Sequence, residues 1–112
     1  MLLPDVDQAV IEPAKIRDYL LASAHPAGGS KATYFLAHGY QRTNWQILAN
    51  DLRGLAETGD ATPDRVTRHG TDYVVTGVVQ TPRGTHVRIR TIWIIPHGER
   101  APRFVTAYPM AR

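Results

Sequence analysis

The chain contains no cysteine, and this absence excludes both disulfide bonds and thiolate-ligated metal sites. It also lacks long apolar runs, since the longest, Ile92 to Pro96, is far too short to span a bilayer. The first residues, Met1 to Asp5, lack the basic stretch and apolar segment of a secretory signal peptide. We therefore expect a cytoplasmic protein that is not bound to a membrane.

Serine is scarce, and neither Ser23 nor Ser30 lies in the GxSxG turn of a serine hydrolase. The stretch Gly28-Gly29-Ser30-Lys31 lacks the first glycine of a phosphate-binding P-loop, so a nucleoside triphosphatase is not expected. None of the five histidines pairs with another at helical i, i+4 spacing, and no HExxH motif occurs. The sequence therefore predicts no metal site and no cofactor.

Length and charge set the scale of the protein. With 112 residues, 43% of them hydrophobic and 21% charged, the chain has the composition of one globular domain spanning residues 1–112. Its net charge of +3 is compatible with a nucleic-acid partner, although many small basic domains bind none.

The first 60 residues have the pattern of helices. Glu12-Pro13 predicts the start of a helix that ends near Ser23, because proline is tolerated in a first helical turn. The stretch His25 to Lys31, with its proline and glycines, predicts a loop. Ser30 is the expected N-cap of a second helix over residues 31–38.

A third helix is predicted between Thr43 and Gly59. Thr43 and Gln46 have the spacing of a capping box, and Gly59 is a natural end. We place Thr62-Pro63 in the connection that follows. The predicted core consists of large apolar residues from these helices and the strands after them: Phe35, Trp45, Leu48, Leu52 and Val87.

The last third of the chain has the pattern of strands. Asp72 to Gln80, Thr85 to Ile95 and Arg103 to Tyr108 are rich in β-branched and aromatic residues and are separated by short turns. Short turns favour antiparallel neighbours. The sequence therefore predicts an α+β fold in which N-terminal helices pack on a C-terminal antiparallel sheet of three or more strands.

The predicted loop before the second helix carries a first candidate site. His25 and Lys31 lie at a helix start, where backbone N–H groups favour anions such as phosphate, and Ser30 is a candidate phosphate ligand there. A lysine stabilises developing negative charge, and a histidine moves protons near neutral pH. Metal-independent RNA cleavage needs these groups. The alternative is a solvated loop whose lysine simply begins a helix.

A second constellation lies on the predicted strands. Thr106 and Tyr108 share one face of their strand because side chains alternate with a period of two. Arg88 and Arg90 likewise share a face of the preceding strand, with Trp93 on the other. Arginine and hydroxyl groups on one sheet face can bind phosphate. The alternative is that Tyr108 and Trp93 only pack in the core or at an edge.

These two regions carry a family resemblance. The stretch from His25 to Phe35, HPxGxxKAxxF, resembles the opening motif of a small bacterial family of unknown function. The stretches TIWII (residues 91–95) and PRFVTAYP (residues 102–109) resemble its close, so the likeness covers nearly the whole chain. Members of that family are free-standing small proteins or C-terminal domains of larger polymorphic toxins.

The layout is also similar to the barnase–EndoU–colicin–RelE superfamily of ribonuclease toxins, in which helices precede a curved antiparallel sheet. Many of these carry a lysine or histidine on the helical segment and a threonine or tyrosine on a late strand. Lys31 matches the first feature, and Thr106 and Tyr108 match the second. His25 matches less closely, because the basic residue varies between families.

The resemblance implies a metal-independent endoribonuclease-like toxin domain that acts on RNA and has a cognate antitoxin or immunity protein. Lys31 would stabilise the transition-state phosphate, His25 would act as general acid or base, and Thr106 with Tyr108 would position the scissile group. The implied phosphate-binding residues are Ser30, Arg88 and Arg90. Fold alone does not establish activity. A non-catalytic nucleic-acid-binding module and an antitoxin- or immunity-type interaction protein therefore stay open as alternatives.

Overall fold

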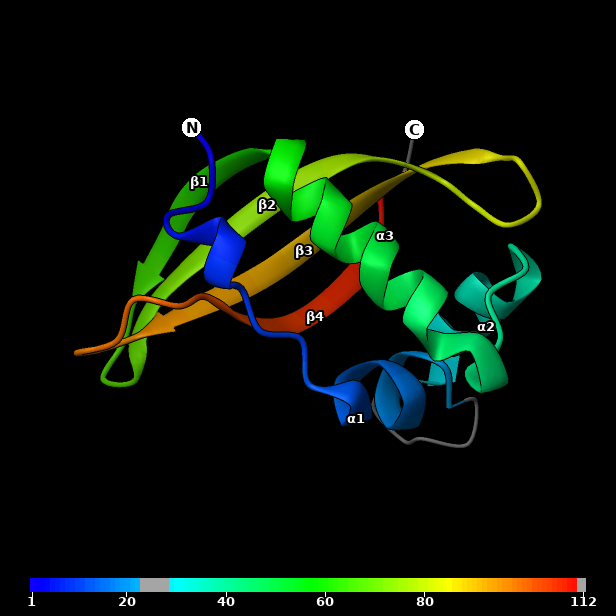
Figure 1. The fold of residues 1–112 in the computed structure, drawn as a ribbon, viewed down its shortest axis with the longest axis horizontal. Helices are drawn as coiled ribbons and strands as arrows, with labels where there is room; N and C mark the ends of the chain where they lie inside the picture. The colour runs from blue at the N-terminus through cyan, green and yellow to red at the C-terminus, as the bar shows by residue number, and fades with distance from the viewer. Residues whose placement is uncertain (23–28, 111–112) are drawn as a thin grey trace.

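The computed structural model describes residues 1–22 and 29–110, with side chains of the second helix described from residue 31 onward. Short helical segments come first and four strands follow (Figure 1). In chain order the elements are η1 (Val6–Gln8), α1 (Pro13–Lys15), η2 (Ile16–Leu20), α2 (Gly29–Ala37), η3 (Arg42–Asn44), α3 (Trp45–Thr58), β1 (Asp60–Val66), β2 (Gly70–Gln80), β3 (His86–Pro96) and β4 (Arg103–Pro109).

The four strands form one antiparallel sheet in sequence order, β1-β2-β3-β4. Each strand pairs with the next along the chain, as short turns require. The predicted α+β class, with helices followed by an antiparallel sheet, is therefore confirmed.

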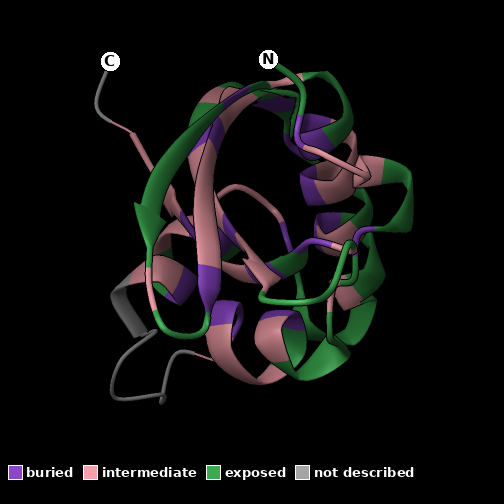
Figure 2. Cartoon of the chain, turned by 90° about the vertical axis from the view of Figure 1, so that its left-hand side faces the viewer, coloured by how far each residue is buried: buried purple, intermediate pink, exposed green. Residues whose placement is uncertain are grey.

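Helix α3 crosses one face of this sheet and closes the core (Figure 1). Its buried residues Leu48, Leu52 and Leu55 recur at helical spacing, so one stripe of the helix faces the strands. Trp93 of β3 is fully buried beneath it, and its indole N–H donates a hydrogen bond of 2.8 Å to the Thr91 hydroxyl. Figure 2 shows the buried segments on the sides of sheet and helices that face the interior.

The predicted core is largely found. Phe35, Leu48 and Leu52 are buried, whereas Trp45 and Val87 are partly buried and pack against the margin of the core. No helix in the part of the chain that the structure describes is long and apolar enough to cross a membrane.

The remaining segments cover the edge of β4. Val10 pairs with Arg103 in an isolated parallel bridge, so the N-terminal segment satisfies backbone groups that an edge strand would otherwise expose. Helix α2 contacts both η2 and β4. A helical unit from the first third of the chain is thereby held against the last strand.

Strand β1 corrects the expectation that Thr62-Pro63 lies in a connection. Both residues pair with β2, and the register shifts between Pro63 and Val66. Proline is tolerated here because β1 is an edge strand, where the missing N–H need not serve a neighbour. The sheet therefore has four strands, in agreement with the predicted three or more, and β1 is the strand that the sequence pattern did not locate.

Three helix boundaries also differ from the prediction. The first helix consists of α1 and the π-helical turn η2 that continues it. It ends at Leu20 instead of near Ser23. Helix α2 begins at Gly29, so Ser30 lies inside its first turn instead of at the N-cap. The capping box at Thr43 does not form, because a 3₁₀ turn precedes α3. The predicted end at Gly59 is correct, and its N–H bonds to the Leu55 carbonyl at 2.6 Å.

Replacement of Leu52 by alanine should lower the free energy of unfolding by roughly 2–5 kcal/mol. The side chain is 0% exposed, so its loss leaves a cavity beneath α3. Urea denaturation measures the change. Ile47→Ala on the same helix is the control: Ile47 is 46% exposed, and we expect a change of only about 0.5 kcal/mol. Equal midpoints for Leu52→Ala and the parent would contradict this packing.

Candidate functional site

The face of the sheet opposite α3 carries a row of polar and charged side chains. In the register of the sheet Thr76 of β2 lies opposite Arg90 of β3, and Arg90 lies opposite Tyr108 of β4. Directly paired residues point to the same face. Their neighbours Ile89 and Ala107 are buried on the α3 side. The strand alternation thus separates a packed face from a face that can meet a ligand.

Lys31 of α2 reaches this face at the β4 edge. Its Nζ donates to the Tyr19 hydroxyl at 2.7 Å and to the Thr106 hydroxyl at 3.0 Å. It also lies 5.1 Å from the ring centroid of Tyr19 and 5.8 Å from that of Tyr108, within range of cation–π attraction. An ammonium has three N–H donors, so one is left to point at a ligand.

The contact with Lys31 changes the acidity of Tyr19. The hydrogen bond from Lys31 lowers the pKa of the Tyr19 phenol, and the bond from Thr106 lowers it further. Both bonds stabilise the phenolate relative to the phenol. Tyr19 is therefore a group that can exchange a proton more readily than an ordinary tyrosine.

Arg90 supplies a second positive charge. Its guanidinium carbon lies 5.9 Å from the Tyr108 ring centroid. Its Nε is buried and has no hydrogen-bond partner among the residues that the structure describes. A buried donor without a partner lowers the stability of the free protein. Arg90 also borders a hollow of about 350 Å³ on the open face, whose other lining residues are Asp60, Thr62, Pro63, Asp64, Val74 and Thr76.

We call these five residues the cationic cluster: Tyr19, Lys31, Arg90, Thr106 and Tyr108. Two basic side chains and three hydroxyls suit a phosphate group. The described residues contain no group of histidine, aspartate and glutamate that could hold a metal ion.

The structure thus brings together four of the residues singled out in the sequence, Lys31, Arg90, Thr106 and Tyr108. Arg88 lies two residues before Arg90 on β3 and is exposed. His25 and the side chain of Ser30 lie outside the described residues. The sequence did not single out Tyr19. Its contact with Lys31 spans 12 positions of the chain, and no sequence signal joined the two.

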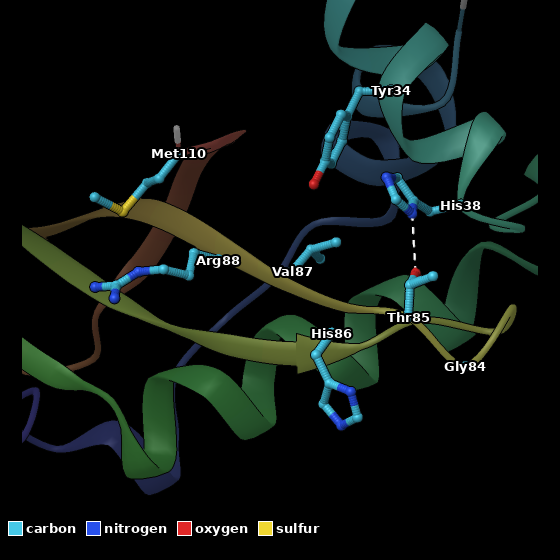
Figure 3. Close-up of a pocket in the computed structure, with 8 residues that line it drawn as sticks. All are labelled: Tyr34, His38, Gly84, Thr85, His86, Val87, Arg88 and Met110. Carbon is cyan, nitrogen blue, oxygen red and sulfur yellow. Dashed lines mark hydrogen bonds between the residues drawn. The ribbon is translucent and has the colours of Figure 1, made fainter. Parts of the chain in front are cut away.

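A second hollow, of about 640 Å³, lies between α2 and the β2–β3 hairpin (Figure 3). In it, His38 Nδ1 lies 3.0 Å from the Thr85 hydroxyl. The lining residues come from the helix, the hairpin and the end of β4: Tyr34, His38, Gly84, Thr85, His86, Val87, Arg88 and Met110.

The fold and the cationic cluster define an α+β domain with a candidate anion site at the edge of its sheet. The chain belongs to the DUF6883 family, described as a domain of unknown function, and the match spans residues 2–111. The expectation of a family of unknown function is thereby confirmed. No curated protein matches the chain.

A solved structure is also similar to this chain. It is described as a contact-dependent growth inhibition toxin–immunity protein complex from Klebsiella pneumoniae 342. The similarity has a TM-score of 0.70 at 17% sequence identity and covers 91% of this chain and 100% of that chain. At this identity the likeness shows a shared fold.

Tyr19 should ionise at a lower pH than Tyr34 and Tyr40, because the pKa of Tyr19 is lowered whereas burial raises the pKa of the other two phenols. Lys31→Met should raise the pKa of Tyr19, because it removes the hydrogen bond and the charge that stabilise the phenolate. The absorbance of tyrosinate in a pH titration measures this change. Tyr19→Phe identifies the phase, since it should abolish the early ionisation. An early phase that is unchanged in Lys31→Met would show that Lys31 does not set the acidity of Tyr19.

Proposed function

We propose that this chain is a metal-independent endoribonuclease-like toxin domain, with residues 1–112 acting as one domain in the cytoplasm. The proposal is based on one observation. Four side chains lie close together at one edge of the sheet: Lys31, Arg90, Thr106 and Tyr108. The sequence resemblance to ribonuclease toxins supports it. So does the fold shared with a chain of a growth-inhibition toxin–immunity complex.

The proposed reaction begins with attack of an RNA 2′-hydroxyl on the adjacent phosphorus. A new P–O bond forms, the bond to the 5′-oxygen breaks, and a 2′,3′-cyclic phosphate results. One proton leaves the attacking hydroxyl and one reaches the departing oxygen, so protons balance. The phosphorane between these states carries extra negative charge, which Lys31 and Arg90 would stabilise in this proposal. Both side chains lie against the Tyr108 ring.

The remaining cluster residues have supporting roles in this proposal. Thr106 holds Lys31, and Tyr108 lies against both Lys31 and Arg90, so they position the scissile group and the charges around it. Tyr19, with its lowered pKa, is a proton-transfer group beside Lys31. We assign His25 the general acid or base role that the sequence motif implies, and Ser30 and Arg88 to phosphate binding.

An interaction protein of the antitoxin or immunity type is the second candidate. The observation that favours it is the shared fold itself, because the matched complex contains both a toxin and an immunity protein. A module that binds nucleic acid without cleaving it would use the same positive face. Growth of cells that express the chain separates these classes: a toxin arrests growth, whereas an immunity protein relieves the arrest caused by its cognate toxin.

The purified protein should cleave total RNA in the presence of EDTA, and Lys31→Ala should slow cleavage by roughly 100- to 1,000-fold. In the proposed reaction the lost ammonium stabilises the developing negative charge. Arg68→Ala is the matched control, because it also removes one positive charge but at the exposed turn between β1 and β2. Gel analysis of cleavage products measures the rates, and circular dichroism confirms that each variant is folded.

Two results would overturn the proposal. Cleavage by Lys31→Ala at the parent rate would remove this residue from the mechanism. A parent protein that leaves RNA intact at all concentrations, and whose expression does not arrest growth, would favour the binding or immunity class.

A further inference from the structure

The 640 Å³ hollow between α2 and the β2–β3 hairpin has the size of a small-ligand site, since such sites span roughly 300–1,000 Å³. No residue of the cationic cluster lines it. Its described lining residues include no aspartate or glutamate and do include Arg88. An anionic ligand therefore meets no like charge at this hollow.

The walls of the hollow suit a flat aromatic group with polar edges. The ring of Tyr34 lies 4.6 Å from that of His38, and the bond to Thr85 fixes His38 in place. Val87 and Met110 add apolar surface. Aromatic rings over an apolar floor are the surfaces on which single-stranded nucleic acids stack their bases.

The hydroxyl of Tyr34 adds a polar contact. It points into the space between α2 and β3 in Figure 3, and it makes no hydrogen bond to another described residue. Burial raises the pKa of the Tyr34 phenol, so the group stays protonated at neutral pH and can donate to a ligand. The edge of a nucleobase offers acceptors for such a donor.

The hollow and the cationic cluster draw residues from the same three parts of the chain. Tyr34 follows Lys31 by three positions on α2, which places both on one side of the helix. Arg88 precedes Arg90 by two positions on β3, a step of roughly 6.5 Å. Beyond β4, the N–H of Met110 bonds to the Arg88 carbonyl at 3.0 Å, just as Tyr108 pairs with Arg90. Residues of the cluster and residues that line the hollow are therefore neighbours on α2, on β3 and at the end of β4.

We propose that this hollow receives one unstacked base of a single-stranded RNA whose adjacent phosphate lies at the cationic cluster. The proposal rests on the proposed ribonuclease function and specifies its substrate as single-stranded RNA, read at one base. The positive charges of Lys31, Arg88 and Arg90 favour a polyanion over an apolar peptide segment as the ligand. Tyr34 is then a binding residue that acts on the base, and Lys31 acts on the phosphate.

The test uses short single-stranded oligonucleotides of 2′-O-methyl RNA, which cannot be cleaved because the attacking hydroxyl is blocked. One series carries an abasic nucleotide at each position in turn, and fluorescence anisotropy measures the dissociation constants at one fixed salt concentration. For the parent protein, removal of the base at one position should weaken binding about ten-fold, the effect of one lost base–aromatic stack. Abasic substitutions distant from it should have little effect.

Tyr34→Leu keeps an apolar side chain against Phe35 and removes the aromatic face. It should bind the intact oligonucleotide about ten-fold more weakly than the parent does and should no longer distinguish the abasic position. Leu36→Ala is the control, because Leu36 is exposed on the same helix and does not line the hollow. It should bind as the parent does. If Tyr34→Leu fails to fold, the dissociation constants of the parent protein for the abasic series are the test of the proposal.

Equal affinity of the parent for intact and abasic oligonucleotides would overturn the proposal and leave the hollow to a protein partner. So would a folded Tyr34→Leu that still distinguishes the abasic position. Cleavage of unmodified RNA is measured in parallel, so the two proposals fail separately. If the binding affinity of the parent protein depends on one base but the protein cleaves no RNA, the result overturns the ribonuclease activity and supports the base pocket. If the parent protein cleaves RNA but its binding affinity does not depend on any one base, the result overturns the proposed base pocket.

Discussion

The ammonium of Lys31 joins three elements that are far apart in the chain: α2, which carries it, η2 through Tyr19, and β4 through Thr106. A half-buried charge is stable only where hydrogen bonds replace the water that it has lost. Two hydroxyls and two aromatic rings do so here. The same contacts that compensate for burial also orient the charge, so the position of Lys31 follows from the docking of α2 against the sheet.

The two faces of the sheet differ in packing and polarity. On the α3 side, Val75, Ile89 and Trp93 are buried and hold the layers together. On the other side, Arg90 has a buried Nε without a partner among the described residues, which is unfavourable for the free protein. A fold tolerates such a group when the packed face supplies enough free energy.

The sequence predicted this division better than it predicted the details. The period of two placed Thr106 with Tyr108 and separated Arg90 from Trp93, because strand alternation is a local property. Strand β1 was missed because Pro63 and two flanking aspartates do not resemble a strand; only its position at the edge allows them. Tyr19 was missed because its hydroxyl meets Lys31 through tertiary docking, which no periodicity encodes. His25 lies outside the described residues, so its place stays a prediction.

The docking of α2 itself depends on a chain of contacts that starts at the core helix. Asp51 of α3 accepts a hydrogen bond of 2.7 Å from the Tyr40 hydroxyl, and burial together with this carboxylate raises the pKa of Tyr40. The Tyr40 ring packs edge-on against Phe35, with centroids 6.1 Å apart, and Phe35 is buried on α2. Lys31 lies one helical turn before Phe35. Helix α2 is therefore held at two points, by Phe35 in the core and by Lys31 at β4. Since Tyr34 is the residue next to Phe35, the same anchoring places its ring at the second hollow. The charge proposed to bind phosphate and the ring proposed to bind a base are thus both positioned by one docked helix, so a movement of α2 would shift them together.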